Sequence, residues 1–495
     1  MNEDIPQSPL PQPAHRPGRI ILLVSVIAVL FIVFFMFRSA KPGVSREPDP
    51  APNLITGGLS LKLSFTYTKL GMERESKAFL GRALEAYQQA ARGSVMPGVI
   101  RRLGLLQGMN QPALAAKTLS GISSPKVLKD LPKVDRPTYI REANMWKRVY
   151  AGAPLTEAEA KEYAEFVETL NAGPARYIAL SAIYRSAGMV KEADAALKSA
   201  QSRYFAHIAI ISVLGLLFIL AGIGGAAGLI AGGIALFVTR NAVVTRFGFS
   251  ESYEEDAPLA LALWRSFFAY IIIFLAGSFL GAYVLQRITS GLPIKQQISY
   301  GIVAQALTYV TIGLLSILLT QILLRREGAG LRAIGLRSFG PGKDIAWGAA
   351  GYAMALPLLG VSLMISNLLR LLLPNAPTPS NPVVPMLMSA AGVPALIAIF
   401  LLAAVVAPFI EEVFFRGVLF RALRARFGVW AAILTSAAAF AIVHPQLPAG
   451  FPPLFVLGMT FAILAQTRNS LLPAMIAHAI NNGGLFLFFI LATRP

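Results

Sequence analysis

A series of long apolar runs is the feature that most constrains the fold of this 495-residue chain. About 20 consecutive apolar residues form a helix that crosses the hydrocarbon core of a bilayer. Eight runs of about this length follow residue 207, at about 208–236, 262–285, 300–323, 345–372, 393–421, 429–445, 452–467 and 471–491. The first run is rich in glycine and allows either one tilted helix or a tight hairpin. The sequence therefore predicts an all-α, polytopic membrane helical bundle.

Two short segments begin the chain. Residues 1–19 are polar and rich in proline, which is typical of a disordered tail, and residues 20–37 form an uninterrupted apolar run. This run is long for the core of a signal peptide, and the charged stretch 38–42 after it contains no clean small-x-small cleavage site. We therefore expect an uncleaved transmembrane signal anchor at 20–37, which brings the expected number of spans to nine.

Residues 38–206 are predicted to form a soluble helical domain. After a proline-rich linker to about residue 53, helical patterns separated by Gly and Pro cover 75–91, 99–106, 113–119, 157–170 and 175–201. The last block resembles a tetratricopeptide repeat, with a turn at Gly188 and packing residues at Tyr184, Ala193, Leu197 and Ala200. An ordinary stack of helical hairpins is the alternative. In either case we expect a groove that recruits a protein or peptide substrate.

The formal net charge of +19 suggests nucleic-acid binding at first sight. However, the basic residues flank the apolar runs, where the positive-inside rule and lipid headgroups account for them. We therefore expect contact with the lipid bilayer and no nucleic-acid partner. Basic residues crowd the loops around 325–343, 421–426 and 468, whereas loops 375–393 and 445–451 contain no charge. This alternation predicts a cytoplasmic N-terminus and an extracytoplasmic 38–206 domain. From the plan of the chain, from its tail to its membrane core, we expect a multi-pass protein of a bacterial plasma membrane.

Two adjacent acids, Glu411 and Glu412, lie inside the fifth apolar run, and Arg416 follows one turn later. A carboxylate at the centre of a membrane helix costs about 2.5–3.5 kcal/mol on insertion scales, so such a residue indicates a functional site. The i,i+4 spacing allows Glu412 to pair with Arg416, while Glu411 points about 100° further round the helix. We therefore expect Glu412 to be structural and Glu411 to be free for chemistry.

Polar side chains of two later runs complete a candidate site. His444 ends the sixth run, and His478 and Asn482 are i,i+4 neighbours in the eighth. Glu411 and His444 are each about 16 residues from the turn at 427–428, so both lie about 24 Å from it in straight helices. A carboxylate base, two imidazoles and an amide can activate water and stabilise an oxyanion. Glu411, His444 and His478 can equally hold zinc with one open position, and the sequence leaves both possibilities open.

The sequence lacks most of the residues that other kinds of intramembrane hydrolytic site require. The chain contains no cysteine, which excludes a thiol nucleophile and cysteine-ligated zinc. No aspartate lies in an apolar run, and the H-E-x-x-H motif is absent. A serine nucleophile opposite a histidine would have to be Ser362 or Ser436.

Taken in chain order, the late runs contain three motifs, Glu411-Glu412-x-x-x-Arg416, Phe440-x-x-x-His444 and His478-x-x-x-Asn482. In type and order these motifs resemble those of the CPBP family. That family groups CAAX-processing endoproteases of the Ras-converting type with bacteriocin-processing and lysostaphin-resistance-like proteins. The resemblance covers about 390–485 by motif and about 207–495 by the eight-span core.

The resemblance implies a role for each motif residue. Glu411 would be the base that activates water, His444 and His478 its partners, and Asn482 the oxyanion donor. Glu412 and Arg416 would be the supporting pair. Members of the family are called metalloproteases, and a metal-free glutamate mechanism is also argued for them. Zinc is therefore one expectation for the cofactor, and no metal is the other.

We expect an intramembrane endopeptidase that cleaves membrane-associated protein or peptide substrates selected by the 38–206 domain. The alternative is a catalytically silent membrane scaffold or immunity-type protein, in which the polar cluster only fixes helix packing. A scaffold should tolerate Glu411→Gln, whereas an endopeptidase should not. A transporter would show paired broken helices or an inverted repeat, and neither is convincing in this sequence.

Overall fold

The computed structural model describes residues 50–92, 96–150, 152, 154–170, 172–239, 257–338, 340–373, 386–387 and 392–494. The expected tail at 1–19 and signal anchor at 20–37 lie outside these residues. Every regular element in the described ranges is a helix, which confirms the all-α prediction.

The N-terminal domain packs its helices around one apolar core. The core includes the fully buried side chains of Tyr87, Leu105, Leu119, Trp146 and Tyr204. Three of its helices, α2, α6 and α7, were not predicted from the sequence. Its elements are α2 (Ala51–Lys69), α3 (Glu73–Ala91), α4 (Pro97–Gln107), α5 (Pro112–Ser120), η1 (Gly121–Ser123), α6 (Pro125–Lys129), α7 (Arg136–Tyr150), α8 (Glu157–Thr169), η2 (Gly173–Ala175) and α9 (Arg176–Ser186).

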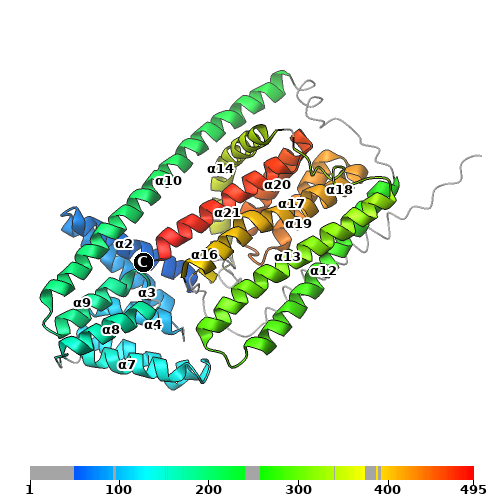
Figure 1. Cartoon of the computed structure of the whole chain (residues 1–495). Helices are drawn as coiled ribbons and strands as arrows, with labels where there is room; N and C mark the ends of the chain where they lie inside the picture. The colour runs from blue at the N-terminus through cyan, green and yellow to red at the C-terminus, as the bar shows by residue number, and fades with distance from the viewer. Residues whose placement is uncertain are drawn as a thin grey trace, which may run out of the picture. The chain divides into compact units, whose positions relative to one another are not determined.

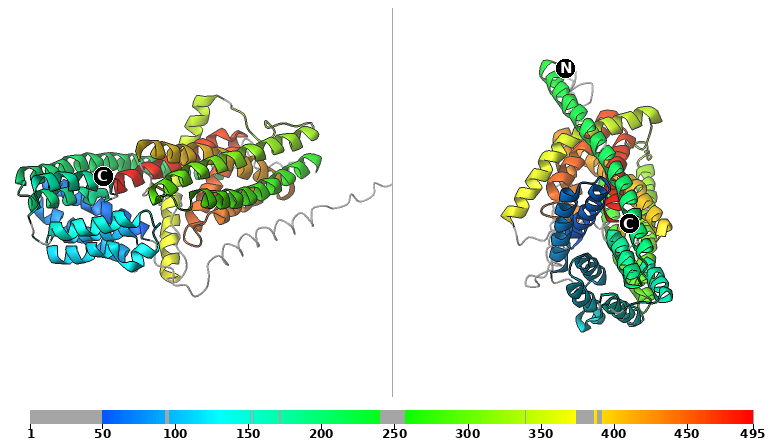
Figure 2. Two further views of the ribbon diagram at one scale, coloured as in Figure 1. Left: turned by 60° about the horizontal axis from the view of Figure 1, so that its bottom comes forward. Right: turned by 90° about the vertical axis from the view of Figure 1, so that its left-hand side faces the viewer.

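A single helix, α10 (Val190–Val238), continues from this domain into the membrane core (Figures 1 and 2). The turn at Gly188, where φ is +72°, separates it from α9 as expected. At 1.5 Å per residue, its 49 residues extend about 74 Å, more than twice the thickness of a bilayer core. The glycine-rich run is therefore one helix, and the hairpin alternative is wrong. Gly225 lets α10 approach α14 closely, because a Cβ there would lie 1.9 Å from the carbonyl oxygen of Ala353.

All eight expected runs of the core are helical. The elements after α10 are α12 (Ala257–Thr289), α13 (Ile294–Arg326), α14 (Pro341–Leu372), the segment 392–427, α19 (Val429–Val443), α20 (Phe451–Arg468) and α21 (Leu472–Thr493). In the described part of the chain, six helices are long and apolar enough to cross a membrane, namely α10, α12, α13, α14, the 393–427 segment and α21. α19 is apolar but shorter. The protein is therefore a multi-pass membrane protein in contact with the bilayer.

The segment that contains the acidic pair is not a regular α-helix. α16 (Gly392–Leu401) leads into a π-helical turn, η3 (Leu402–Val406), followed by α17 (Ala407–Glu412), a second π-helical turn, η4 (Val413–Leu419), and α18 (Phe420–Phe427). π-Helical turns are rare and occur frequently at functional sites. Glu411 and Glu412 lie between the two π-helical turns.

The basic loops meet at one face of the helical core. The N–H of Leu471 donates to the carbonyl oxygen of Gly335 at 2.8 Å, and the side chains of Arg337 and Arg421 donate to Asn469 at 2.8 Å each. The N-terminal domain contacts helix ends of the opposite face, through Lys62 at the end of α21 and Asp135 at the start of α13. This arrangement agrees with the predicted alternation. The assignment of the basic face to the cytoplasm stays a prediction.

Candidate active site

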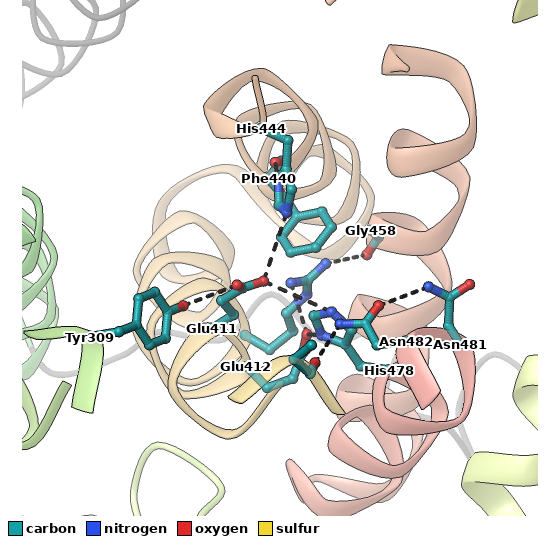
Figure 3. A network of polar contacts seen from close by, with 11 residues as sticks. Tyr309, Glu411, Glu412, Phe440, His444, Gly458, His478, Asn481 and Asn482 are labelled. Carbon is teal, nitrogen blue, oxygen red and sulfur yellow. Dashed lines mark hydrogen bonds and ion pairs between the residues drawn. The ribbon is translucent and has the colours of Figure 1, made fainter. Parts of the chain in front are cut away.

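Glu411 of α17 faces α13. The side chain of Ile410 packs against Gly313 of α13, where an added Cβ would lie 2.2 Å from the isoleucine. One turn before Gly313, the hydroxyl of Tyr309 donates a 3.0 Å hydrogen bond to Oε1 of Glu411 (Figure 3). The hydrogen bond from Tyr309 therefore orients one oxygen of the carboxylate and leaves the other, Oε2, to face the remaining site residues.

Glu412 is fully buried and its Oε1 accepts two hydrogen bonds. One comes from Nη1 of Arg416 at 3.2 Å, so the predicted pair is present, and the other joins Nδ1 of His478 at 2.9 Å. Arg416 is also fully buried, and its Nη2 donates to the carbonyl oxygen of Gly458 at 3.0 Å. The guanidinium lies over the ring of Phe440, 4.4 Å from its centroid. Glu412 is thus the supporting acid, with a cation and an imidazole on the same oxygen.

Both imidazoles turn Nε2 toward Glu411. Nε2 of His444 and Nε2 of His478 each lie 3.9 Å from Oε2 of Glu411 (Figure 3). Nδ1 of His444 lies 2.6 Å from the carbonyl oxygen of Phe440, and a carbonyl only accepts, so we assign the hydrogen to Nδ1. The same assignment holds for His478, because its Nδ1 faces a carboxylate that also accepts from Arg416. In the neutral imidazoles, both Nε2 lone pairs therefore point into the site.

Three acceptor atoms thus converge without a donor between them. Oε2 of Glu411 is buried and has no hydrogen-bond partner among the described residues. The side chains of Glu411, His444 and His478 are 16%, 23% and 5% exposed, so they are largely but not completely shielded from solvent. A buried acceptor without a partner costs about 1–3 kcal/mol. The arrangement suits a bound species that donates hydrogen bonds, or a cation.

Water fits these distances better than zinc. A water molecule that makes hydrogen bonds of about 2.8 Å to two acceptors can bridge atoms 3.9 Å apart. In a tetrahedral zinc site, bonds of about 2.0–2.1 Å place the ligand atoms only about 3.4 Å apart. Among the described residues, no group of three or more His, Asp or Glu side chains is arranged to hold a metal ion. Oε2 of Glu411 is thus farther from each Nε2 than the ligand atoms of tetrahedral zinc are from one another. Zinc at Glu411, His444 and His478 stays an untested prediction.

Asn482 lies beside this cluster on α21. Its Nδ2 donates to the carbonyl oxygen of Ala403 in the π-helical turn η3 at 2.8 Å, and its Oδ1 accepts from Asn481 at 3.0 Å. Oδ1 of Asn481 accepts in turn from Tyr352 of α14 at 3.3 Å. An amide nitrogen carries two hydrogens, so one bond to Ala403 leaves one hydrogen of Asn482 for a substrate oxygen.

Five of the six predicted site residues therefore lie in one network, and Asn482 belongs to a second one with Asn481, Tyr352 and the backbone of Ala403. The structure adds three residues to the first network that the sequence did not indicate. Tyr309 holds Glu411, Gly458 accepts from Arg416, and Phe461 stacks on the imidazole of His478 with centroids 4.8 Å apart. Tyr309 shares its apolar run with Gln305 and Thr308, and no spacing in the sequence distinguishes it from them. The only available signal was a tyrosine inside a spanning segment.

Residues 393–484 match the family model described as Type II CAAX prenyl endopeptidase Rce1-like. The match confirms the resemblance predicted from the motifs and includes all six predicted site residues. Tyr309 and the whole N-terminal domain lie outside the matched residues. No curated protein and no solved structure matches the chain significantly.

Proposed function

We propose, from the match of residues 393–484 to a family of prenyl endopeptidases, that this chain is an intramembrane endopeptidase. Its substrates would be membrane-associated proteins or peptides, because the candidate site is built on helices that cross the bilayer. The observation that carries the proposal is the position of Oε2 of Glu411, which is buried, faces two imidazole nitrogens and has no hydrogen-bond partner among the described residues.

In the proposed reaction, a water molecule held between Glu411 and the two histidines transfers a proton to Oε2. The resulting hydroxide adds to the carbonyl carbon of the scissile peptide bond, and the negative charge moves to the carbonyl oxygen. Asn482 donates its second amide hydrogen to this oxyanion. Glu411 then returns the proton to the leaving nitrogen, the C–N bond breaks, and the products are a carboxyl group and an amine.

The supporting residues keep each group in its role. Tyr309 occupies Oε1 of Glu411, so Oε2 is the atom that receives the proton. Glu412 and Phe440 each hold one imidazole through Nδ1, which keeps the Nε2 lone pair available to water. Arg416 neutralises Glu412, so Glu411 is the only acid of the pair that is not matched with a cation.

The catalytically silent scaffold explains this geometry less well. A polar cluster that only fixes helix packing is most stable when every buried acceptor has a donor. Oε2 of Glu412 and Nε of Arg416 also lack a hydrogen-bond partner among the described residues, but both belong to groups that are paired with each other through Oε1 and Nη1. Within the same part of the chain, Oε2 of Glu411 instead faces two imidazole nitrogens and no cationic side chain. An unpartnered carboxylate oxygen between two imidazoles lowers stability and suits a water-activating base.

For the N-terminal domain, we propose a role in substrate selection. The proposal is supported by an open groove of about 830 Å³ between α7 and α8. Ile140 and Tyr163 supply apolar surface there, beside the charged side chains of Arg141, Arg148 and Glu162. Such a mixed surface suits an extended peptide segment. Tyr163→Ala should reduce cleavage of the substrate, while the remaining cleavage still depends on Glu411.

The proposal is tested by comparing protein termini in membranes from cells that express wild-type protein or Glu411→Gln at equal levels. Gln keeps the shape of Glu and an oxygen that can accept from Tyr309, but it cannot take the proton. Glu327→Gln, at an exposed position just after α13, is the matched control. New termini that appear with wild type and Glu327→Gln, but not with Glu411→Gln, support the endopeptidase. Identical termini in all three membranes would favour the scaffold.

A further inference from the structure

Two charged side chains of the N-terminal domain contact the ends of two core helices. Lys62 of α2 lies at the C-terminal end of α21, and Asp135, just before α7, lies at the N-terminal end of α13. Helix ends carry backbone groups without an intrahelical partner, and a donor or acceptor from elsewhere in the chain can satisfy them. The helix dipole favours an anion at the N-terminus and a cation at the C-terminus, which Asp135 and the protonated form of Lys62 supply.

Lys62 is fully buried at the end of α21. Its Nζ donates to the carbonyl oxygen of Leu491 at 2.6 Å and to the carbonyl oxygen of Arg494. The backbones of α2 and α21 approach closely here, because a Cβ on Gly58, one turn before Lys62, would lie 3.0 Å from the carbonyl oxygen of Ala492. Gly58 allows α2 to lie close to α21, and the long side chain of Lys62 then reaches the carbonyl groups of its last turn.

Asp135 performs the complementary role at α13. Its Oδ2 accepts from the backbone N–H of Ile294, the first residue of that helix, at 2.7 Å. Pro293, which precedes the helix, has no side chain that can cap it. The cap is therefore supplied by a residue 159 positions away in the sequence.

Both helices held in this way contribute a residue to the candidate site. α13 contributes Tyr309, which holds Glu411, and α21 contributes His478, which bonds Glu412 and faces Glu411. Each helix is continuous between its capped end and its site residue. A shift of either end would therefore change the distances at the carboxylates.

We infer that Lys62 and Asp135 are positioning residues of the active site, through which the N-terminal domain holds α21 and α13 in register with Glu411 and Glu412. The inference rests on the proposed function for its catalytic consequence, but not for its structural one. It gives the N-terminal domain, which lies outside the matched family segment, a direct role in the geometry of the site.

The test uses the full-length protein in proteoliposomes with two spin labels. Leu307 on α13 and Leu485 on α21 are 63% and 42% exposed, and the chain has no native cysteine, so Leu307→Cys with Leu485→Cys can be labelled selectively. The distance distribution between the labels is then measured for Lys62→Met and Asp135→Ala. Lys69→Met, at an exposed end of α2, and Asp130→Ala, at an exposed position just after α6, are the matched controls.

We expect Lys62→Met and Asp135→Ala to broaden or shift the distance distribution, and the two controls to leave it unchanged. In the same membranes, production of Glu411-dependent termini should fall about tenfold with Lys62→Met or Asp135→Ala, through kcat rather than KM. Unchanged distances in both variants would overturn the inference, whether or not the chain is a protease. If the distances change in the variants but even the wild-type protein makes no new termini, the proposed function alone is overturned. Asp135 is only partly buried, so its variant keeps the test valid if Lys62→Met does not fold.

Discussion

The hydroxyl of Tyr309 donates a 3.0 Å hydrogen bond to Oε1 of Glu411 across 102 residues of sequence. This bond gives the two oxygens of one carboxylate different surroundings. Oε1 is occupied by the tyrosine, and Oε2 lies 3.9 Å from Nε2 of both His444 and His478. The asymmetry determines which oxygen can act on a water molecule. The residues that maintain it can be tested by substitution.

Tyr309→Phe should lower kcat by about tenfold to a hundredfold with little change in KM. A hydrogen bond to a charged group contributes about 1.5–3 kcal/mol, and its loss would free Glu411 to rotate away from the water site. The measurement is the rate of Glu411-dependent cleavage in reconstituted membranes. Tyr300→Phe, on the same helix but 53% exposed, is the control and should match wild type. Equal rates for the two variants would show that Tyr309 does not position the base.

Arg416→Met should destabilise the protein by about 3–5 kcal/mol, because it leaves the buried charge of Glu412 without its cation. The double variant Glu412→Gln with Arg416→Met removes both charges and should recover most of this loss. Unfolding in detergent measures both effects. Arg426→Met, at an exposed position of α18, should change the free energy of unfolding by less than about 0.5 kcal/mol. A single variant as stable as wild type would mean that the pair contributes nothing to the fold.

The stability that depends on Lys62 should vary with pH. Burial, together with the nearby charge of Arg203, lowers the pKa of Lys62 from 10.5 to about 7 in the folded protein. Between these two values the unfolded chain holds a proton that the folded protein lacks. The free energy of unfolding should therefore rise with pH in this window, by up to about 1.4 kcal/mol per pH unit. Below about pH 6 the contribution should be constant.

The pH effect is isolated by comparing wild type with Lys62→Met, because all other titrating groups are common to both proteins. The difference between their free energies of unfolding should change in favour of wild type from pH 7 to pH 10. A difference that is the same at pH 6 and pH 10 would contradict the lowered pKa.

Metal chelators should not abolish cleavage. The 3.9 Å separations at Glu411 suit a bound water better than tetrahedral zinc, so incubation with 1,10-phenanthroline followed by its removal should leave the rate unchanged. The matched control is the inactive analogue 1,7-phenanthroline, which does not chelate. A loss of activity with the chelator alone that added zinc restores would contradict the metal-free account and assign the three residues as ligands.

Local patterns in the sequence predicted much of the core correctly. Apolar runs located all eight core helices, and i,i+4 spacing predicted the contact between Glu412 and Arg416. The order of the motifs, with the equal distances of Glu411 and His444 from their shared turn, placed these two side chains together. These features depend on the periodicity of single helices and on short connections between them, and both can be recognised in the sequence alone.

The features that were missed depend on contacts between distant segments. α2 follows a proline-rich stretch and contains Gly57 and Gly58, which argue against a helix, but packing against Tyr87 and the end of α21 overrides this low propensity. Tyr309 could not be identified because its neighbour, Glu411, belongs to another helix.

The most direct test of the central claim is hydrolysis in water enriched in oxygen-18. Membranes that contain wild-type protein or Glu411→Gln are incubated in this water, and the new C-termini are analysed by mass spectrometry. The account predicts one oxygen-18 atom in the carboxyl group of each new C-terminus with wild type, and no such termini with Glu411→Gln. Labelled termini at equal levels in both membranes would show that Glu411 is not the base that activates water.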